Sequence, residues 1–272
     1  MTMKFDSNRA WQQATASISA NREVLIALSG VFFLLPTLAF SLLFPQPPAP
    51  AGMDQQASAQ FMLAYYSASV PYMIPVTVLQ AAGVLALLTL LTDRRRPTVG
   101  EAIRIGGSGL LPYLGSQLLL GLAAGLLGAL ALTVAALSGS KALVAAVLLA
   151  MLGVVLYVAV RTSLSAPVIA VDGVRNPITA LSRSWRLTAH NALRITVFYA
   201  LILLAFAIVL SVVTAVAGLL LALVLPAGLA TIVVAVLSAA LGAAMALTFV
   251  AVLAAVHAQL AGEPSDEIIS AF

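Results

Sequence analysis

The sequence predicts an all-α membrane protein with six transmembrane helices and amphipathic helices on its cytoplasmic face. Apolar residues make up 62% of the 272 residues and charged residues only 8%, whereas soluble domains have about 45–50% and about 25%. So few charges cannot cover the surface of a soluble domain of this length. The apolar residues also gather in six stretches, each long enough to cross a bilayer, which takes roughly 20 residues.

We expect a single membrane domain over residues 1–272. Residues 1–23 are polar with scattered apolar positions, which predicts an interfacial helix within 5–23. The six-span bundle follows over residues 24–260, and residues 261–272 form a short acidic cytoplasmic tail. A cleavable signal peptide is the rival interpretation of the first span, but that span has full membrane length. The expected spans are residues 24–44, 71–91, 110–137, 142–160, 195–225 and 229–260.

Each junction between the expected spans carries a turn or stop signal. The first span is followed by the proline-rich run PQPPAPAG. The second span has Pro71 and Pro75 near its start and is followed by the strong stop DRRRP. Residues 97–109 then form a short amphipathic piece. The turn SGSK separates the third and fourth spans, and the turn PAG separates the fifth and sixth.

The distribution of basic residues predicts the orientation. Of the 13 Lys and Arg residues, all but Lys141 fall in the N-terminal segment, the loop 92–109 or the loop 161–194. Positive charge accumulates on the cytoplasmic side of membrane proteins. We therefore expect both termini to be cytoplasmic.

The longest run outside the apolar spans, residues 166–194, predicts a helix lying in the membrane interface. Asn176 and Pro177 form an N-cap followed by proline at the first helical position. Ile178, Leu181 and Trp185 then recur at helical spacing. Three cationic groups, Arg183, Arg186 and His190, occupy another face of the same helix. An apolar stripe beside a cationic one is typical of interfacial helices.

We expect the cationic groups near this face to contact anionic phospholipid head groups. Each Lys or Arg near an anionic leaflet gains about 1 kcal/mol. Topology determination, which needs no binding site, is the alternative interpretation of the same charges. The expected contact residues are Arg94, Arg95, Arg96, Arg161, Arg175, Arg183, Trp185, Arg186, His190 and Arg194.

The residues that could carry chemistry are sparse, so we expect no catalytic site, no metal and no cofactor. Cysteine is absent, which excludes disulfides and thiolate ligands. His257 has no carboxylate at ligand spacing, which favours interfacial placement or a packing contact over metal binding. Asp172-Gly173 invites comparison with membrane phosphotransferases, but the further aspartates that hold their metals are missing. The net charge of +4 is too small and dispersed to suggest nucleic acid.

Small residues predict close helix packing in two spans. Gly121 and Gly125 share one face of the third span, and Ser238 and Gly242 share one face of the sixth. Such faces let helix backbones approach closely. We expect packing within the chain and treat a homo-oligomer as the alternative. The sequence also suggests a weak internal repeat, because an amphipathic segment precedes an apolar hairpin three times.

One signature in the central stretch resembles a known family. Its parts are Ala166-Pro167-x-Ile169, Asp172-Gly173 and Pro177-x-x-Ala180-Leu181-x-x-Ser184-Trp185-x-Leu187. Together with the N-terminal segment and the piece RPTVGEA at 96–102, they resemble the glycerophosphoryl diester phosphodiesterase membrane domain family. These are bacterial six-helix inner-membrane proteins of uncharacterised function, some of which are fused to a soluble catalytic domain. Because nothing here matches that domain, the resemblance implies a bacterial inner-membrane module and not an enzyme.

Three hypotheses of function follow, of which a membrane enzyme ranks last because no acid, base, nucleophile or metal ligand is clustered in the sequence. The first is a non-enzymatic module that engages anionic phospholipid, in membrane lipid homeostasis or as the anchor of a protein partner. The second is a permease or transporter subunit for a small or amphipathic solute. A continuous polar cavity lined by Gln80, Gln117, Thr133 and Thr248 would favour the second hypothesis. Ion coupling is not supported, because no acidic residue lies inside an expected span.

Overall fold

The computed structural model describes residues 5–45, 52, 54–93 and 97–262, and every regular element among them is a helix. Six helical segments are long and apolar enough to cross a membrane, which confirms the predicted all-α polytopic fold. The chain is therefore an integral membrane protein. Its spans are Arg22–Leu43, Gln56–Thr92, Leu110–Leu137, Lys141–Ala170, Ala192–Val224 and Ala227–Ala261.

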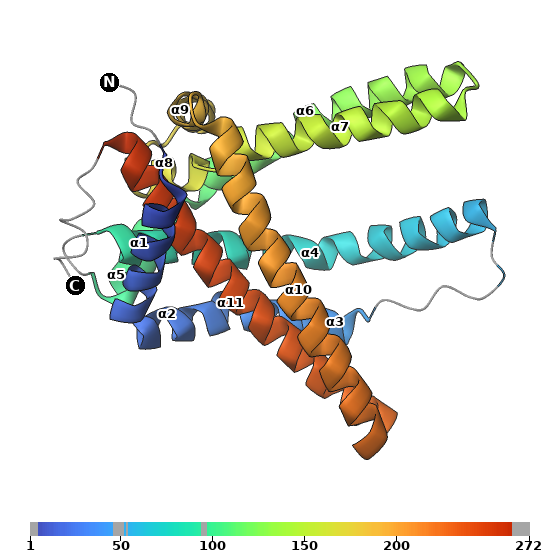
Figure 1. Ribbon diagram of the computed structural model, residues 1–272, viewed down its shortest axis with the longest axis horizontal. Coiled ribbons are helices and arrows are strands. Elements are labelled where there is room, and N and C mark those ends of the chain that lie inside the picture. Colours follow the sequence, from blue (N-terminus) through green and yellow to red (C-terminus); the bar gives the residue numbers. More distant parts are fainter. Residues whose placement is uncertain (1–4, 46–51, 53, 94–96, 263–272) are drawn as a thin grey trace.

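The spans form three helical hairpins, and a shorter helix precedes each one (Figure 1). The first hairpin joins α2 (Arg22–Ser29), η1 (Gly30–Leu34) and α3 (Leu35–Leu43) to α4 (Gln55–Thr92). The second is α6 (Leu110–Leu137) with α7 (Lys141–Thr162), and the third is α10 (Ala192–Val224) with α11 (Ala227–Ala261). The shorter helices are α1 (Ser7–Ala20), α5 (Val99–Ser108), α8 (Ser165–Ala170) and α9 (Pro177–Thr188).

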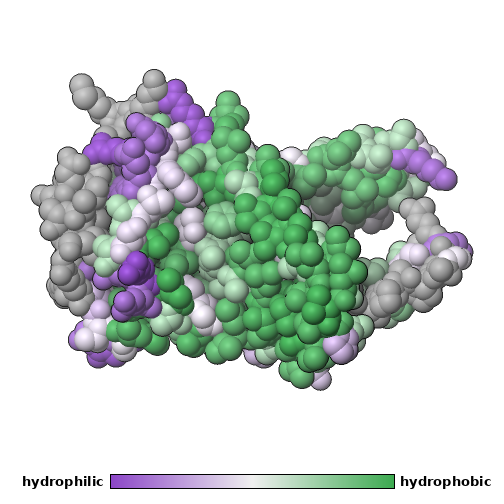
Figure 2. Space-filling view, turned by 60° about the horizontal axis from the view of Figure 1, so that its bottom comes forward, coloured by the Kyte–Doolittle hydropathy of each residue, from purple (hydrophilic) through white to green (hydrophobic). Residues whose placement is uncertain are grey.

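The shorter helices gather at one end of the molecule, which we call the polar end (Figure 1). The hydrophobic core also lies there, where Leu87 and Leu88 of α4 meet Ile195 of α10 and Val250–Val256 of α11. Away from the polar end the hairpins diverge. Figure 2 shows their apolar surface and open space between the α6–α7 hairpin and the far end of α4. Most side chains of α6, α7 and α10 are therefore left for surrounding lipid.

The second span is longer than predicted. Pro71 and Pro75 were expected near its start, but both lie inside α4, which begins at Gln55. Asp54 caps this earlier start, because its side chain accepts a hydrogen bond of 2.7 Å from the backbone N–H of Ala57. Proline removes a backbone hydrogen bond, yet helices in membranes tolerate it where neighbouring helices compensate. The Tyr65 hydroxyl donates to the Phe44 carbonyl and ties the extended part of α4 to α3.

The expected interfacial segments 5–23 and 97–109 contain α1 and α5. Asp6 caps α1 by accepting hydrogen bonds from the backbone N–H groups of Asn8 and Arg9. A capping box starts α5, in which Thr98 and Glu101 satisfy each other's exposed groups. The Thr98 backbone N–H and hydroxyl donate to the Glu101 carboxylate, which lowers the pKa of Glu101 below its usual value. Both helices therefore begin at signals that are local in sequence.

The small-residue faces contact less of the chain than expected. A Cβ added at Gly121, Gly125 or Gly242 would meet no atom within 4 Å. Ser238 donates its hydroxyl to the Val234 carbonyl of its own helix. The structure thus brings no neighbouring helix against these three glycines. Close packing within the α6–α7 hairpin occurs instead at Gly128, where an added Cβ would collide with Met151.

Candidate functional site

Helix α9 is fastened to the end of α7 by a face that lies between its predicted apolar and cationic stripes. Ala180, Ser184 and Thr188 form this face, and each is 0% exposed. The Ser184 hydroxyl donates to the Arg161 carbonyl at 2.9 Å and accepts from the Leu164 backbone N–H at 3.1 Å. The Thr188 hydroxyl donates to the same carbonyl at 3.2 Å. Ile178, from the predicted apolar stripe, faces outward instead and is 66% exposed.

Ser184→Ala is expected to loosen this junction, because it leaves the buried N–H of Leu164 without a partner. An unmade buried hydrogen bond costs about 1–3 kcal/mol. The measurement is the melting temperature in detergent micelles. Ser182→Ala is the matched control, since Ser182 lies on the same helix and is exposed. Equal melting temperatures for the two variants would contradict the assigned docking face.

Docking of α9 encloses the side chain of Arg161, which is 5% exposed. Its guanidinium carbon lies 4.4 Å from the ring centroid of Trp185 and 5.8 Å from that of Tyr157. The two rings meet edge to face, with centroids 5.7 Å apart. Such cation–π contacts are worth about 0.5–2 kcal/mol. Two aromatic walls, one from α7 and one from α9, therefore hold the guanidinium in place.

The buried charge of Arg161 has no acidic partner among the described residues. Its Nε atom is buried and makes no hydrogen bond. Burying a charge without a partner is costly, and proteins normally pair such groups with an anion. Arg161, predicted as one head-group contact among many, thus differs from the others. It is an enclosed cation for which the described part of the chain provides no counter-ion.

The other predicted cationic contact residues fall into three groups. Arg175, Arg186, His190 and Arg194 are exposed at the polar end. Arg183 instead forms an ion pair, described next. Arg94, Arg95 and Arg96 lie outside the described residues.

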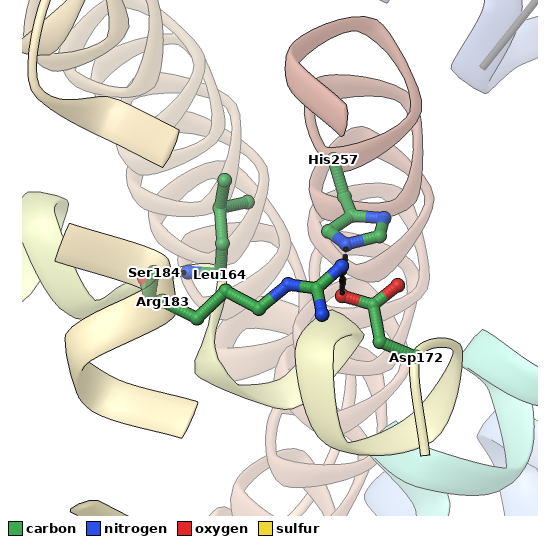
Figure 3. Close-up of polar contacts among 5 residues, drawn as sticks. All are labelled: Leu164, Asp172, Arg183, Ser184 and His257. Carbon is green, nitrogen blue, oxygen red and sulfur yellow. Dashed lines mark hydrogen bonds and ion pairs between the residues drawn. The ribbon is translucent and has the colours of Figure 1, made fainter. Parts of the chain in front are cut away.

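Arg183 belongs to a cluster with Asp172 and His257 (Figure 3). Its Nη2 lies 2.9 Å from Asp172 Oδ2, and His257 Nε2 lies 3.2 Å from the same oxygen. The histidine is 1% exposed within α11. Asp172 reaches it from the turn after α8, where Gly173 has a φ of +69° that favours glycine. The cluster joins the α8–α9 turn to both α9 and α11.

Sequence reasoning missed this cluster because its members are far apart in the chain. The packing contact expected for His257 is an interaction with a carboxylate 85 residues away. No spacing rule within α11 could reveal it. The described residues contain no group of three or more His, Cys, Asp and Glu that could hold a metal ion.

The polar residues that would favour a permease form hydrogen bonds within their own helix or hairpin. Gln80 donates to the Thr37 hydroxyl of the same hairpin at 3.2 Å. Thr133 and Thr248 donate to carbonyls of their own helices. Gln117 is exposed on α6. The structure gives no contact among the four predicted residues, so no observation here favours the permease hypothesis.

Comparisons with protein-family models, with curated proteins and with solved structures found no match for this chain. The family resemblance carried by residues 166–187 therefore stays a prediction. What the structure offers is a chemical arrangement: a buried guanidinium between two aromatic rings, one of which belongs to the helix α9 that also carries the exposed cation Arg186. This arrangement suits an oxyanion such as a phosphate, because a guanidinium donates two parallel hydrogen bonds to such groups.

Proposed function

We propose that this protein is a non-catalytic membrane module that holds an anionic phospholipid at its polar end, with the lipid phosphate at Arg161. The observation that carries the proposal is the enclosed guanidinium without an acidic partner among the described residues. A phosphate would supply the missing charge and accept hydrogen bonds from the guanidinium. Such a module would serve membrane lipid homeostasis or the anchoring of a partner protein.

The surroundings of Arg161 support a lipid as the source of that phosphate. Trp185 is 38% and Tyr157 is 49% exposed, and both residue types are enriched at membrane–water interfaces. Two further exposed cations lie on nearby elements of the polar end: Arg186 follows Trp185 in α9, and Arg194 lies in the first turn of α10. Each would gain about 1 kcal/mol near an anionic leaflet. The proposal places the polar end at the cytoplasmic leaflet, in line with the distribution of basic residues.

Arg161→Gln is expected to lower the retention of phosphatidylglycerol about tenfold or more, since a hydrogen bond to a charged group contributes about 1.5–3 kcal/mol. The measurement is native mass spectrometry of the purified protein titrated with phosphatidylglycerol. Arg161→Lys should fall between the wild type and the glutamine variant. Lysine keeps the charge but loses the planar fork and its stacking on Trp185.

Arg22→Gln is the matched control, because Arg22 is an exposed arginine at the start of α2, at the same end of the molecule. It should leave retention close to that of the wild type. Equal losses for Arg161→Gln and Arg22→Gln would reduce Arg161 to one of several diffuse surface charges. Unchanged retention in both variants would overturn the proposal.

A further inference from the structure

One face of α7 carries a line of small residues that leads to Arg161. Ala146, Ala150 and Gly153 follow one another at spacings of four and three residues. Tyr157 and Arg161 continue at spacings of four, so all five lie on one side of the helix. The three small residues are exposed. The line therefore runs along the outer surface of α7 and ends at Arg161, whose guanidinium lies over the rings of Tyr157 and Trp185.

Larger side chains border this line on both sides. Leu149 and Leu156, which are 71% and 55% exposed, lie on one side, and Val154, 61% exposed, lies on the other. A Cβ added at Gly153 would meet no atom within 4 Å. Small residues between larger ones make a shallow apolar furrow. We call Ala146, Ala150 and Gly153, with these borders, the α7 furrow.

We propose that an anionic phospholipid lies lengthwise on α7, with its phosphate at Arg161 and one acyl chain in the α7 furrow. This inference rests on the proposed function, because it takes Arg161 as the phosphate site. The dimensions agree. From Ala146 to Leu156, the last border residue, the helix rises about 15 Å at 1.5 Å per residue, and half of a hydrocarbon core of about 30 Å is about 15 Å. The length of the furrow along the helix axis therefore matches the hydrocarbon thickness of one leaflet.

Charge favours a lipid over a second copy of this chain as the occupant. Small-residue faces also accept transmembrane helices, so the furrow alone would suit either. The furrow, however, ends at a guanidinium that lacks an acidic partner among the described residues. The long spans of a second copy would bring an apolar surface but no anion to that point. An anionic phospholipid supplies both the chain and the charge.

Gly153→Leu tests the furrow, because a leucine there would occupy the space of the acyl chain. The variant should fold, since leucine favours the helix more than glycine does and nothing lies near the new side chain. Gly125→Leu is the matched control, because it places a leucine at another exposed glycine with nothing within 4 Å, on α6. The probe is phosphatidylglycerol with long acyl chains, compared with a short-chain form of the same lipid. Bound lipid is counted by native mass spectrometry, and oligomeric state is read from the same spectra.

Gly153→Leu is expected to weaken the binding of the long-chain lipid about tenfold, which corresponds to displacing about two buried methylene groups. Binding of the short-chain form should change less, and Gly125→Leu should match the wild type. If Gly153→Leu binds like the wild type while Arg161→Gln does not, the furrow is overturned and the proposed function stands. If neither variant loses lipid, both fail. A change of oligomeric state in Gly153→Leu with unchanged lipid binding would instead assign the furrow to a second copy.

Discussion

Gly106→Ala is expected to destabilise the protein by about 3 kcal/mol, at the upper end of what overpacking costs. A Cβ at Gly106 would lie 2.8 Å from the backbone nitrogen of Ala86 and 2.9 Å from the backbone carbon of Leu85. These are main-chain atoms of α4 at the centre of the core, so they cannot rotate away as a side chain could. The added methyl group would have to push α5 away from α4.

The measurement is the melting temperature of the purified protein in detergent micelles. Gly107→Ala is a matched control, because Gly107 is the next residue of α5, is exposed and has nothing within 4 Å of an added Cβ. That variant should be neutral or slightly stabilising, since alanine favours a helix more than glycine does. The same melting temperature in both variants would mean that α5 does not lie against α4 as described.

The parts of the fold that were predictable have local causes. Length and apolarity identify the six spans. Short caps identify helix starts, as Asn176 does for α9 by accepting from the N–H groups of Ile178 and Thr179. The start of α4 was placed too late because the prolines looked like a boundary, whereas the Asp54 cap sets it. Apart from the start of α4, the expected spans begin and end within three residues of the observed helices, so local signals place helix boundaries well except where a proline inside a helix is mistaken for one.

Helix partners were not predictable in the same way. In a soluble protein the apolar stripe of a helix marks its buried face, but in a membrane the lipid-facing and helix-facing positions are both apolar. The Gly121–Gly125 face of α6 predicted contact and meets no neighbouring side chain. Conversely, α9 docks through Ala180, Ser184 and Thr188, which match neither of its predicted stripes. The enclosure of Arg161 depends on this docking, so the sequence could identify the cation but not its burial.

Substitutions in the cluster of Asp172, Arg183 and His257 are expected to have the second large effect on stability. Three variants, two at Asp172 and one at Arg183, separate the buried contact with His257 from the ion pair with Arg183. Asp172→Ala is expected to cost about 3 kcal/mol, because it leaves a buried group without its partner. That group is His257, which is 1% exposed. Asp172→Asn should cost less, since the amide oxygen can still accept from His257 Nε2. Thermal unfolding in detergent measures all three variants.

Arg183→Ala should cost the least, below about 1 kcal/mol, because ion pairs that water reaches contribute little. The Arg183 side chain is 42% exposed, against 10% for that of Asp172. The expected order follows from burial: the contact with His257 holds the α8–α9 turn on α11, and the ion pair with Arg183 adds little. If Arg183→Ala were as damaging as Asp172→Ala, the ion pair would be the main fastening instead. Arg183 would then be committed to the fold and could not serve a lipid head group, which leaves Arg161 and Arg186 to provide the charge.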